Sequence, residues 1–206
     1  DAIGGGASSP SALTALTGNA TGGTINITAD NGAALNVDSS LPLTAEGLVA
    51  FGENLGSGRG GNVTVSAEDE GAIDVAGGVV IDVSGGGFGN SITQSAGSGT
   101  GGNVNLLAAR GGTLTAAQYD VNASGQTANV FGANGPAQGG FVNVEATAGG
   151  QIAGTDISLG TIIDASALGG VSADGSVAGG GTIQLTAGGG GITFKATTNL
   201  LAGGVA

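Results

Sequence analysis

The chain contains no cysteine, histidine, methionine or tryptophan. Because there is no cysteine, it forms no disulfide bond and offers no thiolate ligand to a metal ion. Because there is no histidine, nucleophilic triads and most proton shuttles lack their usual base. The composition therefore argues against an enzyme, and we expect no catalytic residue, no cofactor and no metal site.

Basic residues are almost as scarce. Arg59, Arg110 and Lys195 stand against 15 aspartate and glutamate residues, and the formal net charge is −12. A nucleic acid requires a basic surface on its partner, so we expect no nucleic-acid binding. An anionic membrane surface is disfavoured for the same reason. No stretch approaches the run of about 18 apolar residues that a membrane span needs, which predicts no membrane insertion.

Glycine, in contrast, is abundant, at 47 of 206 residues. It has no strict three-residue period, which excludes collagen. It recurs instead in one eight-residue phrase, whose first glycines are 38, 41, 38 and 41 residues apart. A phrase at near-constant spacing predicts a repeat architecture. The five copies of this glycine phrase occupy residues 22–29, 60–67, 101–108, 139–146 and 180–187.

Each glycine phrase has the pattern of a half-buried β-strand. Val63 and Val65 alternate with polar residues, and Ile25 and Ile27 do the same in the first copy. Successive side chains of a strand point to opposite faces, so period two with β-branched residues predicts a strand with one apolar face. We expect the stacked copies to form a shared aliphatic column. The preceding glycine pair is interpreted as a break before the strand, where the backbone can take positive φ at low steric cost.

Two further strands are predicted after each phrase. The second set comprises residues 33–37, 72–75, 113–116, 151–153 and 192–194. The third set carries an aspartate before a small polar ending, in residues 81–85, 119–125 and 163–166. This aspartate alternates with apolar positions, so it is expected to point outward or into a turn.

The repeat length leaves two architectures open. A step near 40 residues is either two solenoid coils of roughly 20 residues each or one four-stranded propeller blade. Propeller blades usually carry aromatic signature residues, and this chain has no tryptophan and few other aromatics. We therefore predict an all-β parallel β-helix with roughly 20 residues per coil and no large helices. About ten coils at about 4.8 Å each would make a rod on the order of 50 Å long.

The predicted domain organisation follows the repeats. Residues 1–21 are interpreted as a flexible or partner-seeking lead, residues 22–196 as the solenoid, and residues 197–206 as a capping or flexible tail. The chain has no initial methionine and no signal peptide, so we expect a processed product or a fragment. Three connections share a Phe-Gly step, which either stacks on one corner or forms an apolar ridge for a neighbouring molecule. These steps begin at Phe51, Phe88 and Phe131.

Acidic residues are the remaining candidates for chemistry. Glu68-Asp69-Glu70 is the only acidic cluster, and a solvated turn is the expected role, with a calcium site as the alternative. Paired carboxylates remain conceivable for a polysaccharide-cleaving enzyme. The aspartates that such an enzyme would draw on are spread along the repeats, at Asp74, Asp82, Asp120, Asp156 and Asp164.

The phrase Gly-Gly-Asn-Val-x-Val-x-Ala, alternating with Ile-Asp-Val-Ser-Gly and Ile-Asp-Ala-Ser, resembles the repeats of filamentous haemagglutinin-like exoproteins, over roughly residues 22–196. Those proteins are secreted bacterial β-helix adhesins, many exported by a two-partner route. The amino-terminal secretion domain of that family is not visible here. The resemblance implies a right-handed parallel β-helix outside the cell, with an adhesive, matrix or filament role.

The predicted function is therefore an extracellular structural or adhesive β-solenoid, either the shaft of a surface adhesin or a subunit of a self-assembling filament or matrix. The expected partners are further copies in a head-to-tail arrangement, or host or matrix surface glycans. The alternative is a polysaccharide-binding or polysaccharide-cleaving β-helix protein, located in the same secreted or cell-surface setting.

Overall fold

The alternating residues of the glycine phrases form the longest strands of the molecule. The computed structural model describes residues 4–5, 19–49, 56–89, 97–129, 135–169 and 177–205. In it these strands pair in parallel into a five-stranded sheet, here called the long sheet. The long sheet consists of β3 (Thr24–Ala29), β8 (Asn62–Glu68), β13 (Asn103–Ala109), β18 (Phe141–Thr147) and β23 (Thr182–Gly188).

The second and third predicted strand sets each form a five-stranded parallel sheet of their own. The corner sheet consists of β4 (Ala34–Val37), β9 (Ala72–Val75), β14 (Thr113–Ala116), β19 (Gln151–Gly154) and β24 (Gly191–Phe194). The return sheet consists of β5 (Leu41–Thr44), β10 (Val79–Asp82), β15 (Tyr119–Asn122), β20 (Thr161–Asp164) and β25 (Thr198–Leu201).

Two sheets of shorter strands complete each coil. The glycine sheet consists of β1 (Gly4–Gly5), β6 (Gly47–Leu48), β11 (Gly85–Gly89), β16 (Gly125–Asn129), β21 (Ala167–Leu168) and β26 (Gly204–Val205). The facing sheet consists of β2 (Ala20–Thr21), β7 (Gly58–Arg59), β12 (Gly99–Thr100), β17 (Ala137–Gln138) and β22 (Ala178–Gly179).

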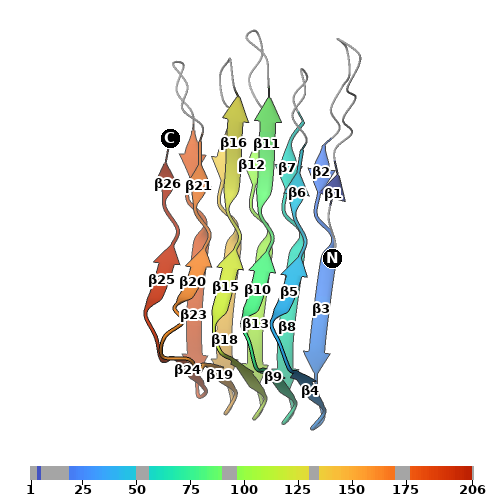
Figure 1. The fold of residues 1–206 in the computed structure, drawn as a ribbon, viewed down its shortest axis with the longest axis vertical. Coiled ribbons are helices and arrows are strands. Elements are labelled where there is room, and N and C mark those ends of the chain that lie inside the picture. The colour runs from blue at the N-terminus through green and yellow to red at the C-terminus, as the bar shows by residue number, and fades with distance from the viewer. Residues whose placement is uncertain are drawn as a thin grey trace.

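The chain therefore winds as a flattened β-solenoid of about four turns. In Figure 1 one side of each coil descends through the long sheet, and the other side ascends through the return and glycine sheets. The strands are stacked side by side in chain order, with the first and last coils at opposite ends of the stack. Parallel β-structure with no helix among the described residues confirms the predicted fold class. The right-handed sense of the coil stays a prediction.

The hydrogen-bonded register shows how many residues one coil of the solenoid contains. Thr24 pairs with Asn62, and Asn62 pairs with Asn103, which are steps of 38 and 41 residues. The spacing near 20 residues separates the two long sides of one coil, since β3, β5 and β8 begin at residues 24, 41 and 62. A complete turn takes a whole repeat, so the prediction of about ten coils is wrong, and each sheet stacks five or six strands. The strand ladder also includes β2 before residue 22 and β25 after residue 196.

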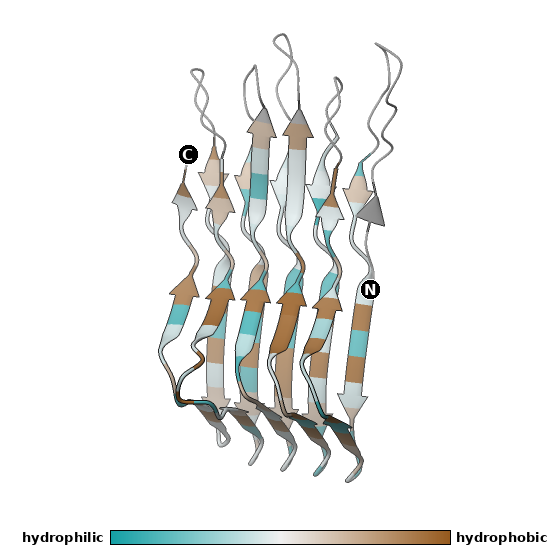
Figure 2. Ribbon diagram, in the orientation of Figure 1, coloured by the Kyte–Doolittle hydropathy of each residue, from teal (hydrophilic) through white to brown (hydrophobic). Residues whose placement is uncertain are grey.

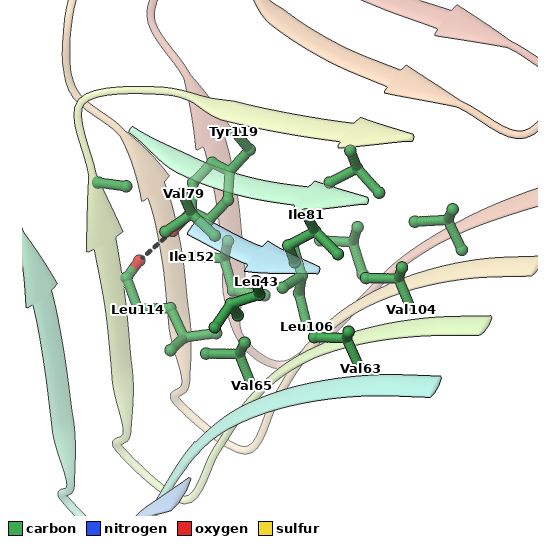
Figure 3. Close-up of a cluster of buried hydrophobic side chains, with 14 of the residues drawn as sticks. Leu43, Val63, Val65, Val79, Ile81, Val104, Leu106, Leu114, Tyr119 and Ile152 are labelled. Atoms are coloured by element: carbon green, nitrogen blue, oxygen red, sulfur yellow. Dashed lines mark hydrogen bonds between the residues drawn. The ribbon is translucent and has the colours of Figure 1, made fainter. Parts of the chain in front are cut away.

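The core lies between the long, corner and return sheets. The aliphatic residues of each phrase point inward and stack in columns, and Val63, Val104 and Val142 are fully buried. Figure 3 shows the long-sheet valines and leucines meeting residues such as Ile81 from the return sheet. Along the long strands of Figure 2 the apolar and polar bands alternate, as period two requires. The predicted shared aliphatic column is confirmed.

Tyr119 is the one tyrosine of the chain, and it is buried in this core. Its hydroxyl donates a hydrogen bond to the Leu114 carbonyl oxygen at 3.1 Å (Figure 3). Its ring meets Phe194 edge-on, with ring centroids 5.8 Å apart. A buried phenol needs such a partner because an unpaired hydroxyl away from water costs free energy.

The glycine pairs have a different role from the predicted one. None of them has positive φ; among the described glycines that conformation occurs at Gly32, Gly111, Gly149 and Gly189. Instead, each pair lies where the two walls of the coil touch. The Gly102 amide donates to the Val83 carbonyl oxygen at 2.7 Å, and equivalent bonds cross three other coils. A Cβ at the first glycine of a pair would overlap the opposite backbone, which explains why glycine recurs there.

The backbones of the glycine sheet and the facing sheet also lie very close to each other. Gly85, Gly99 and Gly125 also leave no room for a Cβ, because the carbonyl oxygens of the opposite sheet occupy that space. The two sheets thus pack backbone against backbone at these positions. Of the Phe-Gly steps, Phe51 and Phe131 lie outside the described residues, and Phe88 is half-buried in β11.

Candidate functional site

The acidic cluster is a turn bridged by arginine. Asp69 and Glu70 have φ of 49° and 64° and connect β8 to β9. Arg110, in the same turn of the next coil, lies 2.5 Å from Glu68 through Nη2, and 2.9 Å from Asp69 Oδ2. Its Nε also pairs with Asp69 Oδ1. The ion pair lowers the pKa of Asp69, chiefly through the hydrogen bond from Arg110.

This arrangement bears on the calcium alternative. Two of the three carboxylates of the cluster already face a guanidinium, whereas Ca²⁺ needs six to eight converging oxygens. In the described part of the chain, no group of three or more acidic side chains is placed to hold a metal ion. The geometry therefore supports a turn that joins two coils across the stack.

The aspartate of the third strand caps the turn that follows it. The Ser84 amide donates to Asp82 Oδ1 at 2.9 Å, and the Ser166 amide donates to Asp164 Oδ1 at 2.8 Å. Asn122 accepts the equivalent bond from the Ser124 amide at 3.1 Å. Asx side chains commonly accept from the amide two residues on, so the prediction of an outward or turn position is confirmed for Asp82 and Asp164. Asp120 instead lies within β15, where it alternates with the buried residues Tyr119 and Val121 and points outward.

Glu46 and Asp82 form a carboxyl pair at this turn. Burial raises the pKa of Glu46, and the negative charge of Asp82 and a hydrogen bond between the two side chains raise it further. Asp82 Oδ2 also accepts from Asn122 Nδ2 at 3.3 Å, so one more polar group faces the pair. The other aspartates considered for catalysis lie apart: Asp74 on the corner sheet, Asp120 on the return sheet and Asp156 in the loop before β20.

Glu46→Gln is expected to stabilise the protein at neutral pH. The pKa of Glu46 is higher in the folded state than its ordinary value of 4.5. Such a carboxyl group makes its full contribution to the stability of the folded state at pH values below the ordinary pKa, where it is protonated. That contribution is lost as pH rises through the raised folded pKa. Glutamine cannot ionise, so the variant should unfold about 1–2 °C higher at pH 7, a small gain because solvent screens the pair.

Thermal unfolding followed by circular dichroism from about pH 3 to about pH 8 measures this effect. The advantage of Glu46→Gln should shrink as pH falls through the raised folded pKa of Glu46, and it should be absent below the ordinary glutamate pKa. Asp30→Asn, at an exposed position, is the control. A constant difference at every pH would contradict the assigned pair.

A shallow depression lies on the outer face of the long sheet. It is lined by Glu68, Leu107, Glu145 and Thr147 together with small residues of β13, and it encloses about 120 Å³. Leu107 pairs in register with Glu145, so a short aliphatic side chain lies beside longer acidic ones. Small-molecule sites usually enclose about 300–1,000 Å³. The depression is therefore too small for a polysaccharide-cleaving site of the usual kind.

The two ends of the solenoid expose apolar residues that belong to the core columns. Leu185 and Leu200 belong to core columns, but in the last coil they are 41% and 46% exposed. The residues of the same columns one coil earlier, Val144 and Ile163, are fully buried. At the other end, Leu35 is 36% exposed, whereas its partner Ile73 is buried. Sequence reasoning placed Leu185 in the shared aliphatic column, Leu35 in a predicted strand and Leu200 in a capping or flexible tail. It did not show that the end coils leave these residues uncovered.

No helix in the described ranges is long and apolar enough to cross a membrane. No protein-family model, curated protein or solved structure matches this chain.

Proposed function

We propose that the chain is an extracellular structural β-solenoid, serving as the shaft of a surface adhesin or as a subunit of a filament or matrix. The observation that carries this proposal is the unbroken ladder. Each sheet keeps one parallel register through all its layers, and one aliphatic core runs beneath them. Stability in such a stack accumulates from neighbouring coils, which suits an elongated load-bearing part.

The repeated sequence motifs support the assignment of this chain to the filamentous haemagglutinin-like exoproteins. The glycine pair recurs at equivalent places in successive coils, and the Ile-Asp-x-Ser ending occurs at equivalent places in two of them, with Val-Asn-Ala-Ser in the coil between. A secreted or cell-surface location agrees with the acidic surface, since a net charge of −12 favours dispersal over nonspecific association. Surface glycans and further copies of the chain are the partners implied by this role.

Incubating the chain with acidic and neutral polysaccharides, immobilised and in solution, tests the proposal. We expect no chain cleavage, with retention on a surface or assembly of the protein as the positive result. Turnover that is lost in Asp82→Asn, but kept in the exposed control Asp30→Asn, would replace the structural role with the carbohydrate-active one. Antibodies to the chain should label intact source cells or their surroundings without permeabilisation.

A further inference from the structure

We propose that the C-terminal coil of one molecule stacks, in register, on the N-terminal coil of a second copy. This inference deepens the proposed structural role and rests on it. The surface in question consists of β22 to β26 at one end and β2 to β5 at the other. Each end presents one coil of parallel strands whose outer edge has no partner strand among the described residues.

The two end strands of the long sheet match in sequence. Thr182-Ile183-Gln184-Leu185-Thr186-Ala187 would lie on Thr24-Ile25-Asn26-Ile27-Thr28-Ala29, with the same inward and outward pattern. Threonine would meet threonine, and the Gln184 amide would meet the Asn26 amide. The interior partner strands carry Asn62, Asn103 and Phe141 at the first of these positions, so the two ends resemble each other more closely than their neighbours.

Charge also favours this pairing. Asp38 and Lys195 lie at the two ends of one column, at the corner between the corner and return sheets. Asp38 directly follows Val37, and Lys195 directly follows Phe194. Those two residues are the ends of one in-register column of the corner sheet, which also contains Val75, Ala116 and Gly154. Both end side chains are exposed and have no ion-pair partner among the described residues. Stacking would place the Lys195 ammonium beside the Asp38 carboxylate of the second copy.

The exposed apolar residues would be covered by the same step. Leu185 would lie over Ile27 of the second copy, and Leu200 would lie over Leu43, as their equivalents do in interior coils. A different partner would need to supply parallel strands of matching length with bends at the same places. This chain meets that requirement itself, so a second copy is the occupant we assign.

Two features of the N-terminal end weaken the proposed contact between the two copies. The glycine sheet already has a sixth strand, β1, on β6, so stacking requires β1 to yield that place to β26 of the neighbour. The exchange keeps the number of strand pairs in that sheet unchanged. Pro42 also lies in the edge strand β5. Leu41 and Ala45 donate inward to the next coil, so the position of Pro42, which has no N–H, faces the open edge. One donor is therefore missing from the interface.

Sedimentation velocity of the full chain over a range of concentrations tests the proposal with a charge exchange. Asp38→Lys and Lys195→Asp should each weaken self-association about 3- to 10-fold, because each replaces attraction by repulsion. The double variant should return to the wild-type level. Glu70→Lys, an equally exposed acid in an interior coil, should leave association unchanged. Pro42→Thr, which restores the donor, should strengthen association.

The proposal is overturned if the wild type and Pro42→Thr both remain monomeric at every concentration, or if the double variant associates no better than the single ones. Circular dichroism of each variant shows whether the solenoid itself is intact. A stable, monomeric, rod-shaped solenoid without activity on polysaccharides would leave the structural role standing and remove only the stacking. An enzymatically active chain would remove the structural role instead.

Discussion

Gly101→Ala is expected to destabilise the protein by about 3–5 kcal/mol or to prevent folding. An alanine Cβ at this position would overlap the carbonyl oxygen of Ala123 and would lie 2.6 Å from the Gly140 amide nitrogen. That amide donates to the same carbonyl oxygen at 2.8 Å, so relief of the overlap would stretch the bond that holds the two walls together. Neither wall can move alone, because each is hydrogen-bonded to the coils before and after it.

Urea denaturation of Gly101→Ala, followed by circular dichroism, measures the loss. Two controls separate the close approach from a general effect of mutation. Gly203→Ala places its Cβ where no atom lies within 4 Å, and Asn105→Ala changes an outward-facing residue of the same coil as Gly101. Each control should change the free energy of unfolding by less than about 1 kcal/mol. Equal losses in all three variants would show that the walls do not constrain this position.

Val65→Asp is expected to cost at least about 4 kcal/mol, because it places an unpaired carboxylate in the aliphatic core. Val65 is 2% exposed and pairs in register with Ile27 and Leu106, so the new charge would be enclosed by aliphatic neighbours on both sides. With no basic residue in the core cluster, the carboxylate would have no counter-ion. The stack should fray or unfold from this coil.

Thr64→Asp is the matched comparison, since it introduces the same charge one residue away on the opposite face. Its register partners are Asn26 and Asn105, which are polar and reach the solvent side of the long sheet. We expect a change of less than about 1 kcal/mol. Similar losses for Val65→Asp and Thr64→Asp, measured as urea midpoints, would contradict the assignment of inner and outer faces.

Local chemistry allowed much of the fold to be predicted. The alternation at Val63 and Val65 identified a strand and its inward face. Asp82 was expected to point outward or into a turn, and it accepts a hydrogen bond within the turn. Both properties depend on the nearest residues along the chain, because strand pleating and Asx hydrogen bonds span only a few positions. Such features are visible in the sequence without knowledge of partners.

The ion pair and the end surfaces could not be predicted from local sequence patterns. The pairing of Arg110 with Asp69 joins residues 41 positions apart, and the column from Asp38 to Lys195 spans the whole stack. A register must be known before such residues can be matched. The alignment of the glycine phrases contained the needed signal, since equivalent positions in successive phrases turned out to be direct neighbours.

The sequence by itself determined that this protein is a repetitive all-β chain, with aliphatic residues on one side of each long strand. Only the tertiary structure showed that one coil contains a whole repeat. It also decided that the glycine pairs serve close contact between walls, and that the two ends leave core residues exposed. The physical reason is that period and turn chemistry act within one strand, whereas coil size, wall separation and end exposure depend on which distant strands pair.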